Sequence, residues 1–270
     1  MGVINVSPES FYRDSVWEDA AALTEAAVRL ESEGADFIDI GAMSTAPYLA
    51  TVVPPEEELR RMTWAIEKLA GVVRVPLSAD TQRADVAAAA LGCGARILND
   101  VAGLRGDPGM AAVARAAEGV VLMASEIGLP AFPSTAAPHE VARAALEHSL
   151  ALADTAGISR QRIVLDPGIG FFTHLRQPAV EFNCGVLRAL RELEPLGQPL
   201  LVGVSRKSFI GKLTGRIDPA ERLAGSLAAS AVAVYNGACI VRTHDVGATR
   251  DAVRVAEALR QNPFTPLARS

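Results

Sequence analysis

Eight short apolar runs recur along the chain, and each is separated from the next by enough residues for a helix. They cover residues 3–6, 37–40, 75–78, 96–99, 120–123, 163–166, 200–204 and 239–242. Each run is rich in Val, Ile and Leu, which is typical of parallel strands buried on both faces. Parallel strands need a crossover connection, usually a helix. The pattern therefore predicts an α/β fold in which strands and helices alternate.

Helix signals occupy the segments between the runs. Apolar residues recur at helical spacing over 20–33, 56–69 and 85–91, and each segment ends at or near a glycine. At 218–221 an acidic N-cap is followed by proline at the first helical position and then glutamate, which predicts a helix running towards Tyr235. Residues 251–259 are expected to form the last helix.

Eight strand–helix repeats in one chain of this length predict a single-domain (β/α)8 TIM barrel. We expect the barrel to cover residues 1–262 and a loose C-terminal tail to cover 263–270. A doubly wound sheet is the rival fold, but it usually has a glycine fingerprint after its first strand. Here Ser7, Pro8, Glu9 and Ser10 follow that strand, so the barrel is favoured.

Composition limits the partners of the protein. The chain has 26 basic and 31 acidic residues and no basic run, which argues against nonspecific binding of nucleic acid. No apolar stretch approaches the roughly 18–20 residues that a membrane span needs, and no signal-peptide pattern is visible. The cysteines Cys93, Cys184 and Cys239 are scattered, so a disulfide framework is not expected. These features favour a cytoplasmic protein that binds small molecules.

Polar side chains follow most of the apolar runs. In a TIM barrel the carboxyl ends of all strands face one mouth, where active sites lie. The residues at or just beyond these ends are Asn5, Asp39, Asp80, Asn99, Met123, Asp166, Ser205, Arg206, Lys207, Arg242, His244 and Asp245. Any one of them alone suits a helix cap or a solvated loop. Because the fold would aim all of them at one mouth, together they predict an active site.

The chemistry of this set points to a ring compound that carries a phosphate. Carboxylate and amide groups at strands three, four and six suit a flat heterocycle with several N–H donors, and Lys207 is placed to donate to a ring carbonyl or ring nitrogen. The last two strands bring Arg206, Arg242 and His244, which suit an anion. The residues alone therefore predict a phosphorylated or pyrophosphorylated ring as substrate.

The strand-end residues lie within runs that resemble the motifs of the dihydropteroate synthase family. The matching runs are 1–11, 34–41 with Ser44 and Thr45, 78–81, 98–101, 165–171, 203–209 and 241–246. They occur in the family's order and span residues 1 to about 250. The run Gly203-Val-Ser-Arg-Lys-Ser-Phe209 is the most specific of them.

The resemblance implies a homodimeric TIM barrel that joins 6-hydroxymethyl-7,8-dihydropterin pyrophosphate to an aromatic amine and releases pyrophosphate, with Mg²⁺ present. The amine would be p-aminobenzoate or a related, larger arylamine, in folate or tetrahydromethanopterin-type cofactor biosynthesis. Carried over by motif, the pterin would be held by Asp80, Asn99, Met123, Asp166 and Lys207. Of these, Asp80, Asp166 and Lys207 would be catalytic. The pyrophosphate would be held by Asn5, Arg242 and His244, with Asn5 also near the metal. The arylamine would be bound by Thr45, Ser205 and Arg206, of which Ser205 and Arg206 flank both the arylamine and the pyrophosphate pockets.

Departures from the family pattern lie on the arylamine side and in the loops. Glu9 replaces an aspartate, Ala46 an arginine, Ala124 a histidine, and Phe172 a glycine of a Gly-Lys pair. They leave open a synthase for a bulkier amine, such as ribofuranosyl-aminobenzene phosphate. They also leave open a pterin-binding barrel without synthase activity, such as a methyl-folate domain that serves a corrinoid protein, or an inactive barrel that acts as a partner protein. The retained pyrophosphate-binding residues count against the methyl-folate alternative.

Overall fold

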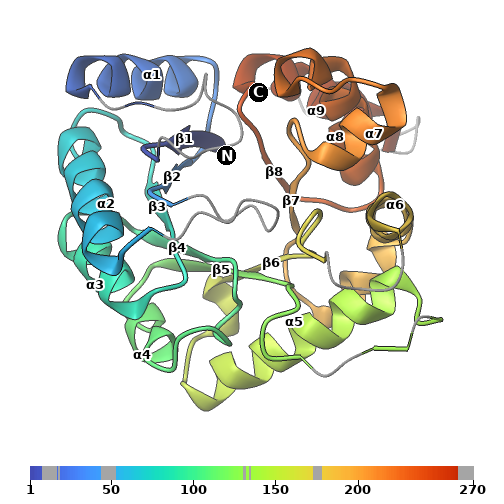
Figure 1. Cartoon of the computed structure of the whole chain (residues 1–270), viewed down its shortest axis with the longest axis horizontal. Helices are drawn as coiled ribbons and strands as arrows, with labels where there is room; N and C mark the ends of the chain where they lie inside the picture. The colour runs from blue at the N-terminus through green and yellow to red at the C-terminus, as the bar shows by residue number, and fades with distance from the viewer. Residues whose placement is uncertain are drawn as a thin grey trace.

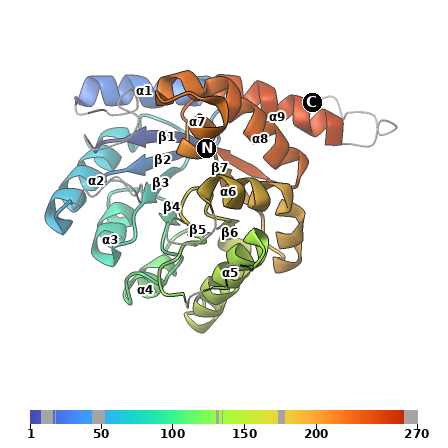
Figure 2. The ribbon, with the colours of Figure 1, turned by 45° about the vertical axis from the view of Figure 1, so that its right-hand side comes forward.

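The strands form a closed parallel barrel in the computed structural model, which describes residues 1–7, 17, 19–43, 53–129, 132–133, 135–172 and 178–260. The strands are β1 (Gly2–Asn5), β2 (Ile38–Gly41), β3 (Leu77–Asp80), β4 (Ile97–Asp100), β5 (Gly119–Met123), β6 (Ile163–Asp166), β7 (Leu201–Gly203) and β8 (Ile240–Arg242). β1 to β6 pair in sequence order, and β7 pairs with β8. Figure 2 shows β1, β2 and β3 running side by side.

Two single bridges close the ring. Leu165 pairs with Leu200 just before β7, and Gly2 pairs with Thr243 just after β8. At the second seam the Val3 N–H donates to the Thr243 carbonyl at 3.0 Å, and the Thr243 N–H donates to the Met1 carbonyl at 3.0 Å. The first and last strands are therefore neighbours, and the (β/α)8 barrel predicted from the sequence is confirmed.

Helices surround the strands on the outside of the ring (Figure 1). They are α1 (Ala20–Ser32), α2 (Pro55–Leu69), α3 (Ala84–Gly92), α4 (Met110–Ala114), α5 (Pro138–Thr155), α6 (Ala179–Arg188), α7 (Ser208–Thr214), α8 (Leu223–Tyr235) and α9 (Val246–Arg260), with short 3-10 turns η2 (Arg160–Arg162), η3 (Leu190–Leu196) and η4 (Pro219–Arg222). Asp218 is the predicted N-cap, because its carboxylate accepts the Ala220 N–H at 2.9 Å, but the single helix predicted from there to Tyr235 is divided into η4 and α8.

Most predicted boundaries are within one residue of those in the structure, but those of β3 and the start of α9 were wrong by two residues or more. β3 begins at Leu77 rather than at residue 75, because Pro76 has no N–H to donate to the ladder. α9 begins at Val246 rather than at residue 251. Its first turn is held by the Glu33 carboxylate, which accepts the Gly247 N–H at 3.1 Å, a contact from the far end of α1 that local sequence does not reveal. The predicted boundary at 262 and the tail at 263–270 lie outside the described residues.

The interior of the barrel has two layers, which follow from the two-residue repeat of a strand. The lower layer is apolar and consists of Met1, Phe37, Ile97, Val121, Val164, Leu201 and Ile240. Two residues further along the same faces stand Asp39, Asn99, Met123, Asp166, Gly203 and Arg242. The apolar layer fills the amino end of the barrel, so the polar layer lies at its carboxyl end.

Candidate active site

A network of charged and amide groups crosses the carboxyl end of the barrel. The Arg242 guanidinium donates from Nε to Asp39 Oδ2 and from Nη2 to Asp80 Oδ2, each at 2.7 Å. Asp39 is fully buried and also accepts from Ser78 Oγ at 2.5 Å and from Asn99 Nδ2 at 3.0 Å. Four strands, β2, β3, β4 and β8, are thus joined by side chains above the apolar layer.

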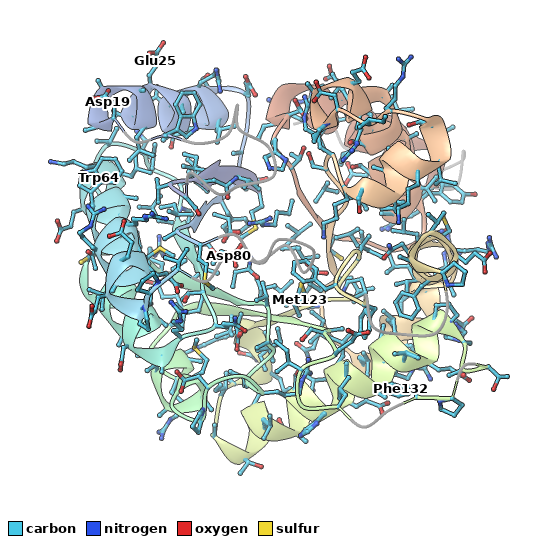
Figure 3. All side chains as sticks on the ribbon, viewed as in Figure 1. Asp19, Glu25, Trp64, Asp80, Met123 and Phe132 are labelled. Atoms are coloured by element: carbon cyan, nitrogen blue, oxygen red, sulfur yellow. The ribbon has the colours of Figure 1, made fainter. Side chains whose placement is uncertain are left out.

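Asp80 has one carboxylate oxygen that remains without a partner. Its Oδ2 binds Arg242, whereas its Oδ1 is buried and makes no hydrogen bond with any described residue. Burial raises the pKa of Asp80 to about 7, and Asp39 adds to the rise while Arg242 opposes it. An unsatisfied buried acceptor is unusual in proteins, and a donor on a bound ligand would satisfy it. Figure 3 shows Asp80 and Met123 inside the ring of helices, whereas Trp64 and Glu25 lie at its edge.

Asp166 and Lys207 form the opposite side of the site. The Gly168 N–H donates to Asp166 Oδ1 at 2.8 Å, and the Lys207 ammonium donates to the Ile169 carbonyl and lies 4.6 Å from the ring centre of Phe171. Burial raises the pKa of Asp166 and lowers the pKa of Lys207 to about 8, while the attraction between the two charges opposes both shifts. This side therefore offers an acceptor and a cationic donor in a region of low polarity.

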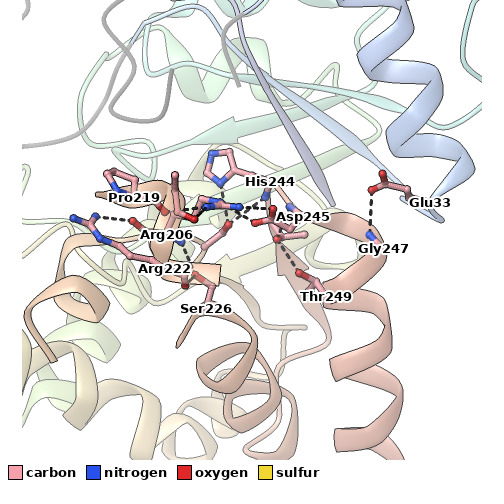
Figure 4. Close-up of polar contacts among 12 residues, drawn as sticks. Glu33, Arg206, Pro219, Arg222, Ser226, His244, Asp245, Gly247 and Thr249 are labelled. Atoms are coloured by element: carbon pink, nitrogen blue, oxygen red, sulfur yellow. Dashed lines mark hydrogen bonds and ion pairs between the residues drawn. The ribbon is translucent and has the colours of Figure 1, made fainter. Parts of the chain in front are cut away.

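The turns after β7 and β8 supply the third side of the site. Ser205 Oγ lies 2.9 Å from His244 Nδ1, and the Arg206 guanidinium pairs with both carboxylate oxygens of Asp245 at 2.7 and 2.9 Å. Burial lowers the pKa of His244 to about 3, and the positive charge of Arg242 adds to the effect. Figure 4 shows Arg206 between Asp245 on one side and Pro219 on the other.

Asn5 and Asp80 both lie close to Gly41 at the end of β2. A Cβ placed on Gly41 would lie 3.1 Å from Asn5 Oδ1 and 3.9 Å from Asp80 Oδ2, so a larger residue than glycine would crowd the Asn5 amide. Among the described residues, no group of three or more His, Cys, Asp or Glu side chains is arranged to hold a metal ion. A cation here would therefore take few protein ligands and obtain the rest from substrate and water.

The structure brings most of the predicted site residues together. Asn5, Asp80, Asn99, Met123, Asp166, Ser205, Lys207, Arg242 and His244 all lie at the carboxyl ends of the strands or in the turns that follow. Arg206 lies there too, but its guanidinium is bound to Asp245 and to the carbonyls of Pro219 and Ala220. Thr45 lies outside the described residues.

Asp39 links Ser78, Asn99 and Arg242 in the network, a role that the sequence did not predict. Its only sequence signal was its position at a strand end. Two of the departures from the family pattern, Ala124 and Phe172, are buried side chains: Ala124 is fully enclosed, and the ring of Phe172 packs 4.8 Å from that of Phe182. These two side chains therefore contribute to the packed core, where the family pattern has a histidine and a glycine.

Comparison with known proteins agrees with this geometry. Residues 1–244 match a family model described as "Pterin binding enzyme". The chain is 43% identical over 271 residues to the dihydropteroate synthase of Neisseria meningitidis serogroup B, covering 97% of this chain and 93% of that protein. Among solved structures, dihydropteroate synthase of Xanthomonas albilineans with 4-aminobenzoic acid is 39% identical with a TM-score of 0.85, covering 97% of this chain and 93% of that one. The same enzyme in complex with 7,8-dihydropteroate is 38% identical with a TM-score of 0.81, covering 97% and 94%.

Fold, site and family model together define a pterin-binding barrel enzyme. Within that class the chain belongs to the dihydropteroate synthase family, and it is a transferase.

The raised pKa of Asp80 has a consequence for stability. Since the pKa of about 7 exceeds the ordinary carboxyl value of about 3.9, the folded state binds the proton more tightly. The stability that this proton contributes is fully present below about pH 3.9 and is lost as the pH rises from there to about 7. We expect the unfolding free energy of the wild type, relative to Asp80→Asn, to fall between about pH 4 and about pH 7 in denaturant titrations and to level off above that range. A rise over that range would contradict the assignment.

Proposed function

We propose that this chain condenses 6-hydroxymethyl-7,8-dihydropterin pyrophosphate with p-aminobenzoate and releases pyrophosphate, as a step of folate biosynthesis. The observation that carries the proposal is the buried, unpartnered Oδ1 of Asp80 in the middle of the polar layer. A pterin ring has N–H donors on its edge that would satisfy it. The choice of p-aminobenzoate is supported by the similarity to an enzyme solved with 4-aminobenzoic acid.

The pterin is bound by groups on opposite sides of the barrel mouth. Asp80 and Asp166 accept from ring N–H groups, and Lys207 donates to a ring carbonyl or ring nitrogen. The Nδ2 group of Asn99 is held by Asp39, which fixes the amide and leaves its oxygen as an acceptor. Met123 is buried at the end of β5 and forms part of the apolar floor under the ring.

The reaction breaks the bond between the pterin methylene carbon and the pyrophosphate oxygen and forms a bond from that carbon to the amine nitrogen, which then loses a proton. The electron-rich ring stabilises positive charge on the methylene, and the buried carboxylates of Asp80 and Asp166 stabilise it further. Within the described part of the chain, Arg242 uses Nε and Nη2 for Asp39 and Asp80 and makes no hydrogen bond through Nη1. Nη1 therefore donates to the departing anion, and His244 is a second donor. No covalent intermediate with the enzyme is required.

A magnesium ion would be held beside Gly41, where Asn5 and Asp80 approach each other. Mg²⁺ usually keeps several waters and takes few protein ligands together with substrate phosphates, so one amide oxygen from Asn5 is a sufficient contribution. When bound, the ion would neutralise charge on the pyrophosphate. Asn5 would thereby orient the leaving group beside Arg242.

We infer a homodimer, as the resemblance to the family implied. Leu213 on α7, Ile217 in the segment after it, and Val232 and Tyr235 on α8 are exposed apolar side chains. A second copy packed against α7 and α8 would bury them, above all Ile217, which is 90% exposed. A cytoplasmic location and the absence of nucleic-acid or membrane partners remain our expectation. None of the helices in the described ranges is both long and apolar enough to cross a membrane.

A panel of amines tests the reaction directly. The purified protein is supplied with the pterin pyrophosphate and Mg²⁺ and with p-aminobenzoate, a bulkier arylamine or no amine, and both pyrophosphate and coupled product are measured. We expect product with p-aminobenzoate and a loss of rate when Mg²⁺ is chelated. Product with the bulkier amine alone would shift the substrate assignment, and pterin binding without turnover for any amine would favour the non-synthase alternative.

Lys207→Ala tests how the pterin is held. Since a hydrogen bond to a charged group contributes about 1.5–3 kcal/mol, we expect kcat/KM for the pterin pyrophosphate to fall roughly tenfold to 100-fold. Lys212→Ala, which removes an exposed lysine from α7, is the matched control and should leave kcat/KM unchanged. An unchanged kcat/KM in Lys207→Ala would refute the role given to this lysine.

A further inference from the structure

Two consecutive residues after β7 pair with two consecutive residues after β8. Ser205 pairs with His244, and Arg206 pairs with Asp245 (Figure 4 shows the second pair), so the two turns are held together by adjacent contacts. By resemblance Ser205 was assigned to the arylamine, at the border with the pyrophosphate pocket. Its hydrogen bonds instead connect it to His244, a residue assigned to the pyrophosphate.

The Ser205 hydroxyl meets His244 at two points. The backbone N–H of His244 donates to Ser205 Oγ at 3.2 Å, and the same oxygen lies 2.9 Å from the Nδ1 of the ring. The hydroxyl has one proton to donate, and within the described part of the chain Nδ1 is the acceptor that lies in reach of it. If the hydroxyl donates this proton to His244, Nδ1 must be unprotonated so that it can accept it. In a neutral imidazole the proton is then on Nε2.

The surroundings of His244 favour the neutral ring. The cationic groups of Arg206, Lys207 and Arg242 are near enough to oppose protonation of the ring, and burial lowers its pKa to about 3 in the same direction. Asp245 is the adjacent acidic side chain, and its carboxylate accepts hydrogen bonds from Nε and Nη2 of Arg206. The ring is therefore neutral at ordinary pH, with its single proton on Nε2 when Nδ1 accepts from Ser205.

The backbone conformation of Arg206 places the preceding residue, Ser205, next to the His244 ring. Arg206 has a φ of +57°, a left-handed conformation that is unusual for a residue other than glycine. Its N–H donates to Ser226 Oγ at 2.8 Å, and its carbonyl accepts from Arg222 Nη1 at 2.9 Å. These contacts from α8 and η4 fix the turn from outside the site.

We propose that Ser205 is a positioning residue that fixes His244 as the neutral Nε2–H tautomer, so that the ring offers one N–H to the diphosphate of the substrate. This role rests on the proposed function, because it takes the diphosphate as the ligand of His244. The Arg206–Asp245 pair and its braces hold Ser205 in place. Ser205 therefore acts on the leaving group through His244 rather than on the arylamine.

The first test reads the tautomer itself. Protein labelled with ¹⁵N-histidine is studied by long-range ¹H–¹⁵N NMR; the chain has four histidines, and the His244 signals are assigned by their loss in His244→Asn. The wild type should show an unprotonated Nδ1 and a protonated Nε2. Ser205→Ala should give a mixture of both tautomers, and Ser205→Thr, which keeps the hydroxyl, should restore the wild-type spectrum. A protonated Nδ1 in the wild type, or an unchanged spectrum in Ser205→Ala, would overturn the proposal.

The second test measures binding and kinetics. We expect Ser205→Ala to weaken binding of inorganic pyrophosphate about fivefold, the effect of a hydrogen bond worth about 1 kcal/mol, with the KM for p-aminobenzoate unchanged. A selective rise in the KM for p-aminobenzoate would return Ser205 to the arylamine site. If the folded wild type binds no pyrophosphate, the proposed function fails, whereas the tautomer measurement still decides the role of Ser205.

Discussion

The site depends on one interaction, the bridge that Arg242 makes between the buried carboxylates of Asp39 and Asp80. These partners are 203 and 162 positions away along the chain, so the bridge exists only when the last strand has closed against the first three. A buried ion pair contributes little net stability, because desolvation of the charges offsets their attraction. Removing one partner is costly, since it leaves a buried charge without compensation. Closure of the barrel and assembly of the site are therefore coupled.

Burial also determines what the site is able to bind. It disfavours charge on Asp80, Asp166, Lys207 and His244 alike, as the direction of each pKa shift shows. A ligand that supplies N–H donors to the carboxylates and an anion to the cationic side satisfies groups that the protein alone leaves incompletely paired. A pterin with a pyrophosphate tail has both features in one molecule, which makes the specificity of the site a consequence of its electrostatics.

The sequence was sufficient to predict the barrel and the location of the site, because both follow from local patterns. The two-residue repeat places an apolar residue such as Ile97 below and a polar one such as Asn99 above on the same face of a strand. The pairings could not be predicted, since they depend on how distant strands align around the ring. The attachment of Arg242 to Asp39, and the capture of the Arg206 guanidinium by Asp245, are of this kind.

The central claim is that Arg242 and Asp39 stabilise the site as a pair, and a double-mutant cycle of unfolding free energies tests it most directly. Asp39→Asn alone should cost about 1.5–3 kcal/mol, because Arg242 then keeps only Asp80 as a carboxylate partner. In the double variant Asp39→Asn/Arg242→Met the total loss should be smaller than the sum of the two single losses by at least about 2 kcal/mol. Losses that add within about 0.5 kcal/mol would contradict the account, because the two side chains would then act independently.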